Sequence, residues 1–203
     1  METGLVSTPS TGDGLWEYLL VIRPDAAVSS SLAAVKQEFA NYYNYEAAVE
    51  LKPHIIIGGF QASEQLENTI IKWVQRICSM QSSFRVALNN YGGVPEHTIY
   101  LRIQDLKPFR ELGNQLTVID NFIRSNNCPP LKLVSRPHLS LATGLPLEIY
   151  NRAMPEYSGR MFYESFMATE LLLLKRLNQF EASRHVNVFR FYPPDTNSYH
   201  QVA

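Results

Sequence analysis

Two histidines in this chain occupy positions from which a pair of imidazoles could transfer protons. His138 opens the stretch His138-Leu139-Ser140-Leu141, in which the period of a β-strand places the imidazole and the Ser140 hydroxyl on one face. An imidazole exchanges a proton near neutral pH, and a hydroxyl beside it can donate to an anionic oxygen. This pairing suits chemistry at a phosphate, although an edge-strand histidine next to a solvent-facing serine is the simpler explanation.

The second histidine lies in a similar stretch, His54-Ile55-Ile56-Ile57, which follows Pro53. Here strand alternation puts Ile56, not a hydroxyl, on the face of the imidazole. If His54 faces a ligand, Ile56 lines the same place with hydrocarbon. The alternative is a buried strand whose histidine only caps its start.

The elements that must position these histidines follow from hydrophobic periodicity. We expect strands near 16–22, 54–59, 84–88, 98–103, 138–141, 166–174 and 186–192, and helices over 28–42, 63–77, 109–123 and 146–154. Residues 89–93, Asn-Asn-Tyr-Gly-Gly, supply the expected turn between two strands. Each half of the chain has a Pro-His strand, a helix and two further strands. The order predicts an α+β protein of two pseudo-symmetric lobes, mainly antiparallel sheet with helices outside and a cleft between the lobes.

Composition and charge limit the classes of protein and of ligand that are possible. The chain has 203 residues, 45% of them hydrophobic, and a formal net charge of −1, so no global positive field attracts long duplex nucleic acid. We expect a flexible tail over 1–14, a single bilobal domain over 15–192 and a loose C-terminal tail over 193–203. Two isolated cysteines, Cys78 and Cys128, favour a cytoplasmic protein without a zinc cluster, and no signal peptide or membrane span is expected.

The paired histidine motifs resemble those of the 2H phosphoesterase superfamily, in particular its 2′-5′ RNA ligase and cyclic phosphodiesterase branch. That family carries two motifs of the form His-hydrophobic-Thr/Ser-hydrophobic. Residues 137–142, Pro-His-Leu-Ser-Leu-Ala, match the second motif, and residues 53–60, Pro-His-Ile-Ile-Ile-Gly-Gly-Phe, match the first except at Ile56. The similarity extends over 16–192 and includes 84–88 and 98–103.

The resemblance implies a metal-independent reaction at a phosphodiester, with His54 and His138 as a general acid and base pair and no cofactor. The implied ligand is a nucleotide or an RNA terminus with a 2′,3′-cyclic phosphate, and Ser140 would bind the phosphate. Two departures weaken this site. Ile56 replaces a hydroxyl, and Thr143 stands where relatives often have arginine, so it can bind the phosphate by donating a hydrogen bond but brings no charge. Three functions are compatible with these departures. The first is an enzyme with slow hydrolysis or ligation, or with a changed substrate. The second is a module that binds a nucleotide or another phosphate ligand with poor turnover, and the third is a domain that binds only other proteins.

Several other side chains are weaker candidates. Arg136 and Arg102 are plausible phosphate neighbours, with plain solvent exposure as the alternative, favoured more for Arg102. Aromatic faces bind bases without strong sequence preference, so Tyr100, Tyr157 and Tyr163 could stack on a base, although such residues are more often core. The other three histidines are expected to be structural or solvated: His97, His185 and His200.

Overall fold

The computed structural model describes residues 14–50, 52–178 and 181–193. The predicted tails, 1–14 and 193–203, lie outside this part except for Gly14 and Pro193, and so does His200. The strands are β1 Leu15–Ile22, β2 Ile55–Ser63, β3 Phe84–Val94, β4 Thr98–Ile103, β5 Lys132–Leu133, β6 His138–Thr143, β7 Tyr163–Ala168, β8 Glu170–Arg176 and β9 Arg184–Arg190. The helices are α1 Ala26–Tyr43, α2 Ala47–Glu50, α3 Glu67–Cys78, α4 Lys107–Ser125 and α5 Leu147–Gly159, with a 3-10 turn at Glu64–Leu66.

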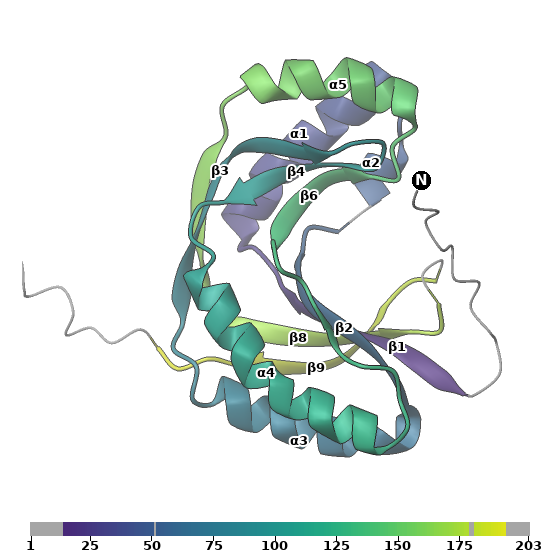
Figure 1. Cartoon of the computed structure of the whole chain (residues 1–203). Helices are drawn as coiled ribbons and strands as arrows, with labels where there is room; N and C mark the ends of the chain where they lie inside the picture. The colour runs from purple at the N-terminus through teal and green to yellow at the C-terminus, as the bar shows by residue number, and fades with distance from the viewer. Residues whose placement is uncertain (1–13, 51, 179–180, 194–203) are drawn as a thin grey trace, which may run out of the picture.

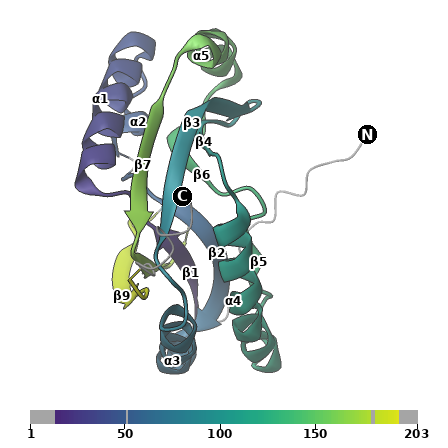
Figure 2. The same cartoon turned by 90° about the vertical axis from the view of Figure 1, so that its left-hand side faces the viewer.

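The strands form two antiparallel sheets, as the sequence predicted. One sheet has the order β5-β2-β1-β8-β9, and the other has the order β6-β4-β3-β7. Helices α1 and α5 pack beside the four-stranded sheet at one end of the molecule, and α3 and α4 pack beside the five-stranded sheet at the other (Figure 1; Figure 2). The α+β class with helices outside is therefore confirmed.

The helices form where apolar side chains recur at helical spacing. In α1 the buried positions include Val28, Leu32 and Phe39, and the Asp25 side chain caps the start by accepting a hydrogen bond from the Val28 amide at 2.9 Å. The helix expected over 63–77 starts as the 3-10 turn at Glu64–Leu66 and continues as α3 from Glu67, and the Ser63 side chain before the turn makes no capping bond. None of the described helices is long and apolar enough to cross a membrane.

Two strand predictions need correction. The expected long strand 166–174 is two strands, β7 and β8, which separate at Thr169 and enter different sheets: Ala168 pairs with Phe84, whereas Glu170 pairs with Arg190. The expected turn at 89–93 is instead part of β3. The chain reverses at 95–97, where Glu96 has a φ of 60°.

The sheets exchange strands between the two halves of the sequence. The strands that follow the His54 segment, β3 and β4, pair with β6, which begins at His138. Strand β8, which follows the His138 segment, pairs instead with β1, the neighbour of β2. This exchange ties the two motifs into one fold, because neither histidine-bearing strand has a complete sheet within its own half.

Candidate functional site

His54 lies directly before β2 and is half-buried. Its Nδ1 donates a hydrogen bond to the backbone carbonyl oxygen of Lys52 at 2.8 Å. Because a carbonyl can only accept, the hydrogen of the neutral ring sits on Nδ1, and Nε2 carries the free lone pair. The backbone therefore selects the tautomer in which Nε2 can accept a proton.

His138 is the first residue of β6 and is held in the same way. Its Nδ1 donates to the backbone carbonyl oxygen of Arg136 at 3.0 Å, so Nε2 is again the free nitrogen of the neutral ring. The Arg136 side chain is exposed, and the contact that Arg136 makes with His138 comes from its backbone.

The two strands behind these histidines lie next to one another although they belong to different sheets. Residues of β2 and β6 approach within 8 Å between Cα atoms, and Figure 1 shows both strands between the helices at the two ends of the molecule. The fold thus brings together two segments that are far apart in the sequence.

Both motif strands contain a β-bulge at the same place, three residues after the histidine. In β2, Val21 pairs with Ile56 and Leu20 with Gly58, so Ile57 is the extra residue. In β6, the residue left over is Leu141, because Tyr100 pairs with Ser140 and Ile99 with Ala142. An inserted residue shifts everything after it to the other face of the sheet.

The bulge in β6 decides where Thr143 points. Ser140 pairs with Tyr100 and Thr143 with Thr98, and Tyr100 and Thr98 lie two residues apart on one face of β4. Ser140 and Thr143 therefore share a face despite their odd separation. Both hydroxyls are partly accessible on the side of the sheet that carries His138.

Ile56 is half-buried and packs against hydrocarbon. It packs against a small cluster on the five-stranded sheet that is separate from the main core, formed by Leu19, Val21, Leu172 and Leu174. This cluster lies on the sheet face opposite Leu20 and Ile22, which belong to the main core. The position of the expected hydroxyl is thus part of an apolar layer beside His54.

Tyr100 lies against the ring of His138, with 4.4 Å between the ring centroids and 37° between the planes. The contact depends on Gly92, the partner of Tyr100 in β3, because a Cβ on that glycine would lie 3.0 Å from the Tyr100 ring. Tyr157, in contrast, is buried, and Tyr163 is exposed. Of the three predicted tyrosines, Tyr100 is the one in contact with a motif histidine.

The electrostatic surroundings of His54 are positive. Burial lowers the pKa of His54 below its ordinary value of 6.5; the bond to the Lys52 carbonyl opposes this, and the charges of Lys36, Arg23 and Arg176 lower the pKa further. Arg176 is paired with Glu17 at 2.6 Å. A neutral imidazole among cations suits a site that receives an anion and accepts a proton.

Lys36 was not among the candidates from the sequence. It lies on the buried face of α1 and is 2% exposed, and burial lowers its pKa from 10.5 to about 8. The available signal was a lysine at the apolar positions of a helix, between Leu32 and Phe39. Such a residue is easily taken for a solvated one that extends past the core.

The sequence model of the 2'-5' RNA ligase superfamily matches residues 24–179, most of the chain. The chain belongs to the 2′-5′ RNA ligase superfamily. No curated protein sequence matches it.

Solved structures with low sequence identity to this chain share its fold. The protein TT0787 of Thermus thermophilus superposes with a TM-score of 0.64 at 13% identity, over 87% of this chain and 98% of that one. LigT of E. coli complexed with phosphate gives 0.61 at 12% identity, over 89% and 99% of the two chains. LigT complexed with 3'-AMP gives 0.60 at 12% identity, over 87% and 98%. At such identities the similarity shows that this superfamily member shares their fold.

Proposed function

We propose that this protein is a metal-independent phosphodiesterase that opens a 2′,3′-cyclic phosphate at an RNA end or on a nucleotide. The observation that carries the proposal is the matched hydrogen bond of His54 and His138, which leaves one Nε2 on each ring free for proton transfer. E. coli LigT, which shares the fold, has been crystallised with 3'-AMP, ATP and phosphate, which supports a nucleotide ligand.

In the proposed reaction His54 is the general base. Its Nε2 takes a proton from water as the water oxygen attacks phosphorus, and the bond from phosphorus to one ribose oxygen breaks. His138 enters this step as the imidazolium, with Nδ1 still donating to the Arg136 carbonyl, and gives its Nε2 proton to that leaving oxygen. The product is a phosphate monoester with a free ribose hydroxyl. The base role goes to His54 because its lowered pKa keeps the ring neutral at pH 7.

The proposed phosphate ligands come from the His138 side. Ser140 and Thr143 share the face of His138, so their hydroxyls can donate to the phosphoryl oxygens as charge develops. Both Arg102 and Arg136 are exposed, and Arg102 is the better candidate cation because it pairs directly with His138 across β4 and β6. On the His54 side Ile56 offers no donor.

The test is hydrolysis of a 2′,3′-cyclic nucleotide by purified protein in EDTA. We expect His54→Ala and His138→Ala each to lose roughly 10²- to 10⁴-fold in rate, the usual contribution of a general acid or base. His185→Ala is the matched control, since His185 is exposed on β9, at the other edge of the five-stranded sheet from β2 and β5. Equal rates for wild type and His138→Ala would remove His138 from the mechanism.

The packing of Ile56 favours a second candidate, a module that binds a nucleotide or phosphate ligand with little turnover. A hydroxyl donor is replaced by a side chain that belongs to an apolar cluster, so the oxyanion receives donors from one side only. Calorimetry that shows tight nucleotide binding, together with no turnover dependent on either histidine, would favour this candidate over the enzyme.

A further inference from the structure

The joint between α1 and α2 lies close to β6, the strand that carries the His138 motif. Both helices contain residues within 8 Å of β6 between Cα atoms. Helix α1 ends at Asn44, whose φ of 53° turns the chain, and the amides of Asn44 and Tyr45 both donate to the carbonyl oxygen of Ala40. This left-handed end places Tyr45 outside the helix, at the start of the joint.

Tyr45 reaches from this joint to the backbone at the end of β6. Its hydroxyl oxygen lies 2.7 Å from the carbonyl oxygen of Thr143 and 3.1 Å from that of Gly144. Because a carbonyl can only accept, the hydroxyl donates its one hydrogen to this pair of oxygens. Burial raises the pKa of Tyr45 above its ordinary value of 10.0, so the hydroxyl keeps that hydrogen at neutral pH.

The ring of Tyr45 is itself held in place. It packs edge-on against Phe39, with 6.4 Å between the ring centroids and 83° between the planes. Phe39 is fully buried in the core on the inner face of α1. The hydroxyl of Tyr45 is therefore carried by a ring with little freedom to move.

The end of β6 depends on contacts from outside its own sheet. In the part of the chain that the structure describes, β6 forms one edge of the four-stranded sheet, with β4 as its neighbour. The strand ends at Thr143, and Gly144 then takes a φ of 68°, a conformation that favours glycine. The Leu145 amide donates to the carbonyl oxygen of His97, directly before β4, at 3.0 Å. The ends of strands open most easily, so the Tyr45 hydrogen bond stabilises a segment that would otherwise fray.

The carbonyl that Tyr45 binds belongs to the residue whose side chain is a proposed phosphate ligand. Thr143 shares a face with Ser140 because of the bulge at Leu141, which disrupts the regular pairing just before it. A fixed carbonyl oxygen fixes the ψ angle of Thr143. The χ1 rotamers open to a β-branched side chain depend on φ and ψ, so the Tyr45 bond limits the directions in which the Thr143 hydroxyl can point.

We propose that Tyr45 is a positioning residue that acts through Thr143, because its hydroxyl fixes the end of β6 so that the Thr143 hydroxyl donates to the phosphate beside His138. A neutral donor is effective only over a narrow range of angles, whereas a charge acts across space. A threonine at this position therefore needs a fixed backbone. The inference rests on the proposed function for its phosphate, and it adds a residue that lies outside both histidine motifs.

The test is a double-mutant cycle with inorganic phosphate as the probe and calorimetry on the full chain as the measurement. We expect Tyr45→Phe and Thr143→Val each to raise the Kd for phosphate roughly 2- to 12-fold, the effect of one neutral hydrogen bond. Because Tyr45 acts through Thr143, Tyr45→Phe has no further effect in the Thr143→Val background. A purely structural loss would instead weaken binding by the same factor in both backgrounds.

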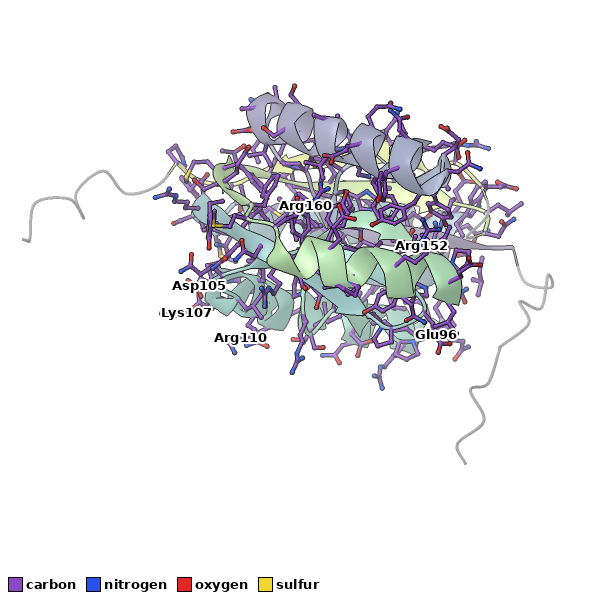
Figure 3. The ribbon with its side chains drawn as sticks, turned by 90° about the horizontal axis from the view of Figure 1, so that it is seen from above. Glu96, Asp105, Lys107, Arg110, Arg152 and Arg160 are labelled. Atoms are coloured by element: carbon purple, nitrogen blue, oxygen red, sulfur yellow. The ribbon has the colours of Figure 1, made fainter. Side chains whose placement is uncertain are left out.

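Tyr43→Phe is the matched control, because it removes a hydrogen-bonded hydroxyl from the same helix. Tyr43 donates to the Glu156 carboxylate of α5 at 2.7 Å. That carboxylate lies beside Arg160, which Figure 3 shows between α1 and α5 and which pairs with Glu38 of α1 at 2.9 Å. We expect both tyrosine variants to unfold at lower urea concentration than wild type, and only Tyr45→Phe to lose phosphate affinity.

The outcomes distinguish failure of this inference from failure of the proposed function. An unchanged Kd in Tyr45→Phe, equal losses in the two backgrounds, or a wild type that does not bind phosphate overturns the role of Tyr45. Hydrolysis of a cyclic nucleotide that depends on His138 can still stand in that case. The expected coupling between Tyr45 and Thr143 without any hydrolysis overturns the enzyme but keeps the positioning role.

Discussion

His54 and His138 make the same hydrogen bond: each Nδ1 donates to the carbonyl oxygen of the residue two positions earlier, at 2.8 and 3.0 Å. Each histidine is followed three residues later by a β-bulge, at Ile57 and at Leu141. The two motifs are thus equivalent in backbone geometry, and they differ in what their side chains meet. Ile56 meets hydrocarbon, whereas Ser140 lies beside Tyr100 on a polar face.

The lowered pKa of His54 predicts the acid limb of the pH profile. A general base must be neutral, and a folded-state pKa below 6.5 keeps His54 neutral as the pH falls through that value. We therefore expect kcat/KM for a 2′,3′-cyclic nucleotide to decline only below pH 6.5. Arg23→Gln removes a positive charge that acts on His54, so it raises the pKa and moves the limb to higher pH.

The control for this experiment is Arg110→Gln, at an exposed position of α4. A limb centred at or above 6.5 in wild type contradicts the assignment of His54 as the base. So does a limb that does not move in Arg23→Gln.

Ile56→Thr tests whether the missing hydroxyl limits the rate. Loss of one oxyanion donor costs about 10²- to 10³-fold in other enzymes, so we expect a gain of roughly tenfold to a hundredfold over Ile56→Val. Valine is the matched control, because it has the shape of threonine without the hydroxyl. Both variants lose about 1 kcal/mol of unfolding free energy or more, since Ile56 packs on the cluster around Val21. Equal rates for the two variants exclude the hydroxyl as the limiting feature.

Gly92→Ala tests the contact between Tyr100 and His138. A Cβ at position 92 would lie 3.0 Å from the Tyr100 ring, so the ring must move and its packing on His138 loosens. We expect kcat to fall several-fold while KM changes little, because the phosphate ligands remain. Gly159→Ala is the control, since a Cβ there meets no atom within 4 Å. Unchanged kcat in Gly92→Ala argues that Tyr100 does not position His138.

The burial of Lys36 predicts a rise of stability with pH. Its folded-state pKa of about 8 lies below the unfolded value of 10.5, so between these pH values the unfolded chain binds more protons, and raising the pH favours the folded state. At about 1.4 kcal/mol per pKa unit the effect from pH 8 to 10 is up to about 2 kcal/mol. Urea unfolding of wild type and Lys36→Met over this range isolates it, because other titrating groups cancel in the difference. A constant difference between the two proteins contradicts the prediction.

Much of the fold was predictable because it follows from local periodicity. The structure confirms the β-strand alternation in 138–141 and the helix expected over 28–42. The secondary-structure predictions failed where one local sequence pattern is compatible with two different structures. Asn-Gly-rich residues 89–93 suit a turn, but Asn90 uses its φ of 54° within β3 at a bulge. Residues 166–174 contain no glycine or proline, and the polar pair Thr169-Glu170 is compatible with a continuous strand, so the sequence does not mark Thr169 as the point where the chain changes sheets.

By itself the sequence determined which residues could do the chemistry: two histidines, one hydroxyl at Ser140 and an isoleucine at the matching position. Tertiary structure alone decided what surrounds them. Pairing between strands decides which face Thr143 occupies and brings Tyr100 against His138. Packing of α1 places the positive charge of Lys36 near His54. A bulge shifts every later side chain to the other face of its strand, and a buried charge acts across space. Neither effect can be read from spacing along one strand.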